Sequence, residues 1–117
     1  MEGRYKVEFL EESAEFLDNL EQKAREKVLY NFWKARLTQD QELFKKLTDD
    51  IWEFRTLYNQ THYRLFAFWD KTEAVEKLVV STHGIVKKTK KTPPKEIQKA
   101  VQIKEKYFNL KHGNNEK

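Results

Sequence analysis

The sequence contains no cysteine, two prolines and three glycines among its 117 residues. The lack of cysteine excludes disulfide bonds, thiolate metal sites and cysteine nucleophiles. Long apolar segments are missing as well, since the longest run extends from Leu65 to Trp69 and the first residues lack the apolar core of a secretory signal. We therefore expect a cytoplasmic protein that makes no contact with a membrane.

Histidine is scarce too, and its spacing bears on metal binding. The three histidines, His62, His83 and His112, lie too far apart for the pair on neighbouring turns of one helix that commonly holds zinc. We expect neither a metal nor another cofactor. The length is that of one ordinary domain, with a core large enough to need no cross-links, so we expect residues 1–117 to form a single domain.

Charge is distributed unevenly along the chain. Residues 1–82 carry 13 Lys/Arg and 16 Asp/Glu, a net charge of −3, whereas residues 83–117 carry 10 and 3, a net charge of +7. Five lysines of the basic part fall within nine residues, namely Lys87, Lys88, Lys90, Lys91 and Lys95. Such a cluster is typical of a surface that contacts a phosphate backbone, although similar runs are also common on solvated surfaces.

The segment from Ile51 to Lys91 alternates apolar and polar residues in three runs, as strands do. In the second run, one face is formed by Tyr63, Leu65, Ala67 and Trp69. The other face carries His62, Arg64, Phe66 and Phe68. A third strand is expected over residues 75–86, where Leu78 and Val80 alternate with Val79, Ser81 and His83. Gly84 permits a bulge or a close backbone approach there.

The turn between the first two runs has a consequence for charge. A loop of two or four residues centred on Asn59 and Gln60 places Arg55 directly opposite Arg64. Like charges opposite each other destabilise a sheet, so this register requires a nearby carboxylate, such as Glu53, or a phosphate. A loop of odd length or a bulge would instead make the two arginines diagonal neighbours.

Helices are expected on both sides of this segment. Ser13 can cap a helix, and from there to Leu37 apolar residues recur every four positions. This stripe drifts by about 40° per step on a helix of 3.6 residues per turn. We therefore expect two helices, or one helix kinked between Asp18 and Gln22, in preference to a single curved helix.

The remaining segments complete an expected α+β fold. Residues 4–10 alternate as a short strand, and the apolar cluster within residues 38–50 predicts a short helical turn. Thr92 can cap a final helix that tolerates the two following prolines in its first turn, continues to about Leu110 and ends by Gly113. We expect a small antiparallel sheet of about four strands, an N-terminal helical hairpin and a C-terminal helix.

Three motifs accompany this order of elements: W-E-F-R at 52–55, Y-R-L-F at 63–66, and H-G-I-V-K-K at 83–88 followed by K-T-P at 91–93. With these motifs at these intervals, nearly the whole chain resembles the RelE/ParE toxin superfamily, and within it the HigB-like, phage-derived branch. The resemblance implies a RelE-like fold and the toxin of a type II toxin–antitoxin system. Such a toxin cleaves mRNA, usually on the ribosome, and is neutralised by a small helix-turn-helix antitoxin, through which alone it would meet operator DNA.

The implied chemistry is a transesterification without metal, in which an RNA 2′-OH attacks the adjacent phosphate and the 5′-oxygen leaves. The resemblance assigns Arg55 and Arg64 to the phosphate and its transition state, a role that suits the planar guanidinium group. Lys87 and Lys88 match the basic position beside the leaving group, and one of them could donate the proton if adjacent cations lower its pKa. RNA contacts are expected from Lys90, Lys91 and Lys95.

The identity of the general base is open at this stage. Glu53 stands where RelE itself has a basic residue, so either Glu53 or His83 could take the proton, and imidazole has the more suitable ordinary pKa. Glu53 could equally pair with Arg55 or Arg64, and His83 could be a structural residue. Two other functions also remain: inhibition of DNA gyrase without catalysis, as ParE toxins do, and RNA binding without chemistry.

Overall fold

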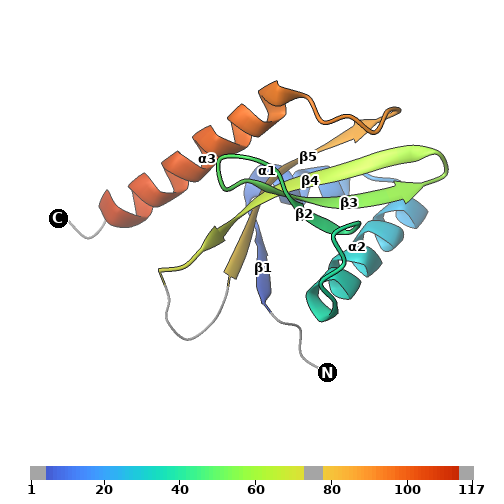
Figure 1. The fold of residues 1–117 in the computed structure, drawn as a ribbon, viewed down its shortest axis with the longest axis horizontal. Coiled ribbons are helices and arrows are strands. Elements are labelled where there is room, and N and C mark those ends of the chain that lie inside the picture. Colours follow the sequence, from blue (N-terminus) through green and yellow to red (C-terminus); the bar gives the residue numbers. More distant parts are fainter. Residues whose placement is uncertain (1–4, 73–77, 114–117) are drawn as a thin grey trace.

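A computed structural model describes residues 5–72 and 78–113 (Figure 1). The elements follow in the order β1 (Lys6–Phe9), α1 (Glu11–Asp18), α2 (Gln22–Leu37), β2 (Phe44–Lys46), β3 (Trp52–Tyr58), β4 (Thr61–Asp70), β5 (Leu78–Lys87) and α3 (Pro94–Gly113). The α+β class is confirmed. The first part of the strand expected over residues 75–86 lies outside the described residues.

The described residues form one five-stranded sheet in the order β1-β5-β4-β3-β2. The expectation of about four antiparallel strands is wrong in two respects. Residues 44–46, expected within a helical turn, form β2 along β3, because three residues are too few to show the alternation of a strand. In addition, β1 runs parallel to β5, although the other neighbouring strands are antiparallel.

The β3–β4 hairpin has the predicted register. Asn59 and Gln60 both adopt positive φ angles, of 52° and 62°, as the central residues of a type I′ turn do. Tyr58 and Thr61 pair on either side of this two-residue turn, and Arg55 therefore pairs with Arg64. The prediction that two cations face each other across the hairpin is confirmed.

Two helices, α1 and α2, occupy the segment for which a kink or a break was expected. The capping role predicted for Ser13 is wrong, because α1 begins at Glu11 and Leu10 precedes it. Ser13 lies inside the helix and is fully buried, with its hydroxyl oxygen 2.7 Å from that of Ser81 in β5. This contact fixes α1 against the sheet.

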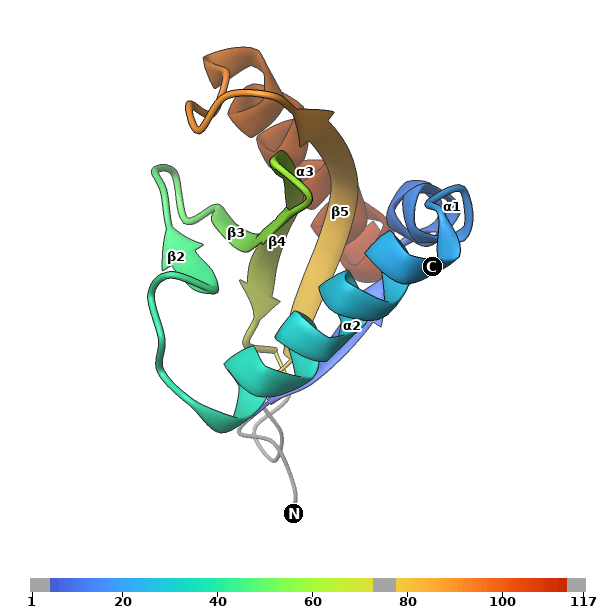
Figure 2. The same ribbon diagram turned by 90° about the vertical axis from the view of Figure 1, so that its right-hand side faces the viewer.

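The helices cover opposite faces of the sheet, as the two ribbon views together show (Figures 1 and 2). Helices α1 and α2 pack Leu17, Val28 and Phe32 against the face that carries Phe54 and Leu65. Helix α3 packs Ala100 against the other face, where the core is formed by Ile51, Phe66, Phe68 and Val80. Arg64 shares this second face, because it lies two residues before Phe66 on β4.

A bulge in β5 changes the face on which His83 lies. Phe66 pairs with His83 and Ala67 pairs with Ser81, so Thr82 is the extra residue. His83 consequently lies on the α3 face with Phe66, so the expectation that it shares the face of Val79 and Ser81 is wrong.

Gly84 shows the close approach that was expected of it. A Cβ atom at Gly84 would lie 2.4 Å from a ring carbon of Phe16 in α1. Such a distance leaves no room for a side chain, so α1 can pack closely on β5 because residue 84 is a glycine.

Helix α3 is fixed to the sheet at both ends. Thr92, expected to be its cap, lies two residues before the helix and donates its hydroxyl to Glu53 instead. Near the other end, Tyr107 and Lys111 both donate to the buried carboxylate of Asp70 in β4. None of the helices in the described residues combines the length and the apolar character needed to cross a membrane.

Candidate functional site

The two arginines of the hairpin share one carboxylate. Arg55 Nε and Arg64 Nη1 each lie 3.7 Å from Oε2 of Glu53. We call these three residues the arginine cluster. Arg64 and Glu53 are each 2% exposed, and the Arg55 side chain is 13% exposed. Because one carboxylate faces two guanidinium groups, the arginine cluster keeps a net charge of +1.

Two donors of the arginine cluster lack a hydrogen-bond partner. Within the described residues, Arg55 Nε and Arg64 Nη1 are both buried and form no hydrogen bond. Their distance from Glu53 gives charge pairing but exceeds that of a hydrogen bond. A buried donor without a partner is costly, and a phosphate oxygen is an acceptor of the charge and geometry that guanidinium groups bind best.

The charge environment of Arg64 follows from its burial. Burial lowers the pKa of Arg64, Glu53 opposes this shift, and Arg55 adds to it. A guanidinium group remains protonated in spite of such a shift. Arg64 is therefore a positive charge in a largely dry environment, where it interacts with an anion more strongly than it would in water.

The lysine-rich segment between β5 and α3 packs against the arginine cluster. Arg64 Nη2 donates to the carbonyl oxygen of Lys90 at 2.9 Å, and Thr92 donates to Oε1 of Glu53 at 3.1 Å. Lys87 donates to the carbonyl oxygen of Lys91 and is half-buried. The structure thus brings the chain around Lys87 and Lys90 to the arginines.

The other predicted basic residues are more peripheral. Lys88, Lys90 and Lys91 have exposed side chains, and Lys95 is exposed in the first turn of α3. Among these four lysines, the contact with the arginine cluster is made by the carbonyl oxygen of Lys90. Their predicted contacts with RNA remain predictions.

His83, one of the two predicted bases, lies in the core beneath α3. It is 1% exposed, and its ring stacks on Phe66 with ring centres 4.9 Å apart. Its Nδ1 lies 2.9 Å from the Thr82 hydroxyl, and its Nε2 lies 3.1 Å from a carboxylate oxygen of Glu96. Burial lowers the pKa of His83, against the opposing effect of Glu96. Both ring nitrogens are engaged, so this conformation presents neither to a substrate.

His62, which sequence reasoning considered as a metal ligand, lies beside the arginine cluster. It pairs with Lys87 of β5 on one side and with Leu57 of β3 on the other, and it shares the face of Arg64. Burial is the largest cause that lowers the pKa of His62, followed by the positive charges of nearby arginines and lysines. The alternation of β4 already placed His62 on the face of Arg64, but the register with β5 was needed to place it beside Lys87.

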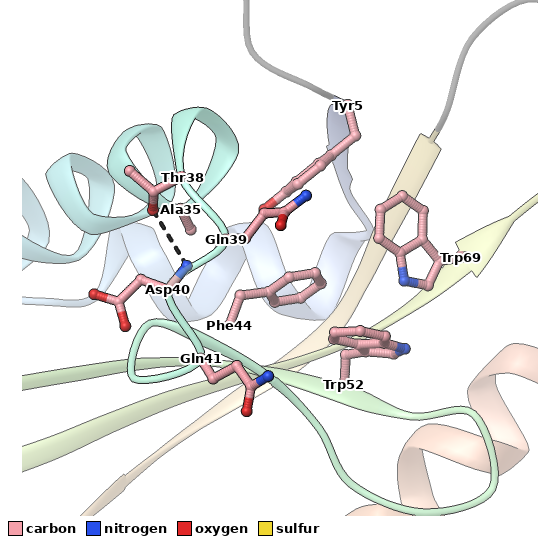
Figure 3. A pocket seen from close by; sticks show the side chains of 9 residues that line it. All are labelled: Tyr5, Ala35, Thr38, Gln39, Asp40, Gln41, Phe44, Trp52 and Trp69. Carbon is pink, nitrogen blue, oxygen red and sulfur yellow. Dashed lines mark hydrogen bonds between the residues drawn. The ribbon is translucent and has the colours of Figure 1, made fainter.

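The opposite face of the sheet holds a pocket of about 590 Å³ with a different character (Figure 3). The rings of Tyr5, Phe44, Trp52 and Trp69 line it, together with residues from the end of α2 and the segment that follows. Burial raises the pKa of Tyr5, whose hydroxyl therefore stays protonated. None of the predicted site residues lines this pocket, and it offers no cation to a phosphate.

No cluster of three or more His, Asp or Glu side chains that could hold a metal ion occurs in residues 5–72 and 78–113.

The family model described as phage derived protein Gp49-like (DUF891) matches residues 15–105. The chain therefore belongs to the Gp49-like family of phage-derived proteins, which is associated with RelE-like toxins. No curated protein matches the chain.

Proposed function

We propose that this chain is the toxin of a type II toxin–antitoxin system, of the HigB-like branch of the RelE/ParE superfamily, and that it cleaves mRNA on the ribosome. Membership of the Gp49-like family is compatible with a toxin role. The observation that carries the nuclease proposal is the pair of buried donors, Arg55 Nε and Arg64 Nη1, which belong to paired residues of the hairpin and form no hydrogen bond within the described residues. A phosphate group would satisfy both.

The proposed reaction is a transesterification of RNA. The 2′-oxygen of one nucleotide forms a bond to the phosphorus of its own 3′-phosphate, and the bond from phosphorus to the 5′-oxygen of the next nucleotide breaks. The products are a 2′,3′-cyclic phosphate and a free 5′-OH. Negative charge grows on the phosphoryl oxygens in the transition state, and the two fixed guanidinium groups stabilise it without having to reorganise.

Glu53 has a positioning role in this scheme. Its Oε2 lies between the two arginines and its Oε1 accepts the hydroxyl hydrogen of Thr92. The carboxylate offsets the repulsion between the cations and holds them in register. When a phosphate binds, the net charge of +1 in the arginine cluster gives the anion a favourable field.

Lys87 is the best-placed donor for the leaving 5′-oxygen. It is half-buried at the end of β5, and its neighbour in the sheet is His62. The exposed Lys88, Lys90, Lys91 and Lys95 would bind the RNA backbone or ribosomal RNA nearby. A helix-turn-helix antitoxin is the proposed neutralising partner, and operator DNA would be reached through it.

The test is primer extension on a defined mRNA in a purified translation system, with the same mRNA without ribosomes in parallel. Cuts that require ribosomes are the expected result. Cuts on free RNA as well would show a ribonuclease that acts without the ribosome. No cuts, together with growth arrest on expression, would contradict the nuclease proposal and favour gyrase inhibition, which a DNA supercoiling assay then measures.

A variant with Lys87 and Lys88 changed to Ala tests the lysine contribution. We expect weaker binding to ribosomes and a smaller dependence of binding on salt, because each lost phosphate contact lowers the slope by about 0.7 for a single strand. The matched control changes Lys23 and Lys27 of α2 to Ala, which removes the same charge elsewhere. Equal loss in both variants would show that total charge, and not this segment, determines ribosome binding.

A further inference from the structure

His62 lies in a different environment from the buried histidine of the same sheet face. It is half-exposed near the start of β4, and the charged groups that influence it are Arg64 on its own strand, Arg55 on β3, Lys87 on β5 and Lys90 in the segment that follows. The carboxylate of Glu53 lies between the two arginines, with its Oε2 3.7 Å from each of them. An accessible imidazole thus stands within a group of cations.

The sheet geometry places the imidazole of His62 close enough to a phosphate bound by the arginines to exchange a proton with the RNA. Residues two apart on one strand are separated by roughly 7 Å, and directly opposite residues on neighbouring strands by roughly 5 Å. His62 is two residues from Arg64 and directly opposite Lys87. The 2′-oxygen and the 5′-oxygen flank the same phosphorus, so one imidazole and one ammonium on adjacent strands can serve the two ends of the reaction.

We propose that His62 is the catalytic residue that takes the proton from the 2′-OH of the bound RNA, an inference that rests on the proposed nuclease function. As the 2′-oxygen bonds to phosphorus, its proton moves to the neutral ring of His62. The electron pair of the breaking bond leaves with the 5′-oxygen, which takes a proton from the ammonium of Lys87. His62 then returns its proton to solvent, and Lys87 regains one.

The surrounding cations suit this role. Burial lowers the pKa of His62 most and these cations lower it further, so the neutral imidazole, which is the form that accepts a proton, is favoured. The other two candidates are less accessible: both nitrogens of His83 are engaged in the core, and Glu53 is 2% exposed between the arginines. Of these three residues, His62 is the one whose side chain reaches solvent beside the arginine cluster.

The experiment measures single-turnover cleavage of mRNA on programmed ribosomes as a function of pH, for the full-length protein. The wild-type rate is expected to fall as pH decreases through the pKa of His62, because protonation removes the acceptor. His62→Gln should be slower by about 100-fold, within the range for loss of a general base, and should lack this acidic limb. His83→Gln should keep the limb, and His112→Gln is the matched control on the surface of α3.

A second variant separates the loss of a base from a change in binding. His62→Ala should regain part of its cleavage rate when free imidazole is added, whereas Arg64→Ala should not. An acidic limb that persists in His62→Gln at an undiminished rate would overturn the role of His62 and leave the nuclease function intact. Absence of cleavage by the wild-type protein would overturn both proposals together.

Discussion

The two ends of the α3 face of the sheet differ in whether their buried polar groups have hydrogen-bond partners. At one end, which we call the closed end, α3 covers His83 and Asp70, and the buried polar atoms of both have partners. At the other end, the open end, Arg55 and Arg64 have buried donors that form no hydrogen bond to any residue in 5–72 and 78–113, and the half-exposed His62 lies beside them. The same strands therefore have satisfied polar groups where the helix covers them, and they carry the proposed phosphate site where it does not.

The two histidines show this contrast within one residue type. The pKa of each is lowered, and burial is the largest cause for both. The second cause differs, since Glu96 opposes the shift at His83 whereas Arg64 and other cations add to it at His62. A lowered histidine pKa thus accompanies a core position at His83 and a half-exposed position beside the arginine cluster at His62, and the neighbouring groups distinguish the two.

The largest expected effect comes from Arg64→Lys at the open end. Lysine keeps the charge but cannot supply the planar fork that reaches a phosphate, Glu53 and the Lys90 carbonyl together. We expect mRNA cleavage to fall by about 100-fold or more. The measurement is single-turnover cleavage, with circular dichroism to verify folding. Arg25→Lys on the surface of α2 is the matched control, and equal activity of Arg64→Lys and wild type would remove Arg64 from the site.

Next in size is the effect of Asp70→Asn at the closed end. The Asp70 carboxylate accepts hydrogen bonds from Thr72, Tyr107 and Lys111, and these hold its pKa well below the usual range although burial opposes them. The asparagine amide has no negative charge, and its N–H group would face side chains that are themselves hydrogen-bond donors. We expect the free energy of unfolding to fall by about 2 kcal/mol in urea denaturation at pH 7. Cleavage per folded molecule should not change, and a specific loss of activity would contradict the division between the ends.

A smaller effect is expected for Tyr107→Phe. The substitution removes the hydroxyl that donates to Asp70 at 2.6 Å but keeps the ring that packs against Phe68 and Phe108. We expect a loss of about 1 kcal/mol in the free energy of unfolding, from the same denaturation experiment. In the Asp70→Asn background the loss should be smaller, because the acceptor is already weakened. Additive losses would show that the hydroxyl contributes independently of Asp70.

The smallest expected effect is the pH dependence of stability contributed by His83. Its folded-state pKa lies below the ordinary value of about 6.5, so the unfolded chain binds more protons over this range. The contribution of His83 is complete above about pH 6.5 and decreases as pH falls from there toward the folded-state pKa. Urea denaturation between pH 7 and pH 5 measures it in His62→Gln, which removes the other shifted histidine. The double variant that also carries His83→Gln should lose this pH dependence of the free energy of unfolding. An unchanged slope of that free energy against pH would contradict the contribution of His83.

The parts of the fold that follow from local sequence were predictable. Asn59 and Gln60 tolerate the positive φ angles of a two-residue turn, so the pairing of Arg55 with Arg64 could be derived from the hairpin alone. The drift of the apolar stripe after Ser13 favoured two helices, or one kinked helix, over a single curved helix, and the structure has two helices. Both predictions depend on residues that lie close together in the chain.

The parts that failed depend on contacts between distant residues or on very short elements. Strand β2 has three residues, and its pairing with β3 gives no local signal. The bulge at Thr82 changes the face of His83 because of the register with β4, which the β5 sequence alone does not determine. The same limit applied to His62, whose neighbour Lys87 is supplied by β5.

The parallel pairing of β1 with β5 determines when the sheet can be completed while the chain is being synthesised. Lys6 pairs with Leu78, so about 70 further residues must be made before the first strand finds its neighbour. Contacts so distant in sequence form slowly, because a long loop must close first. The β3–β4 hairpin can form early from its own turn, whereas the edge that β1 provides must wait for β5. The Lys90 carbonyl that binds Arg64 follows later still, so an unfinished chain carries the two arginines before it carries the segment that encloses them.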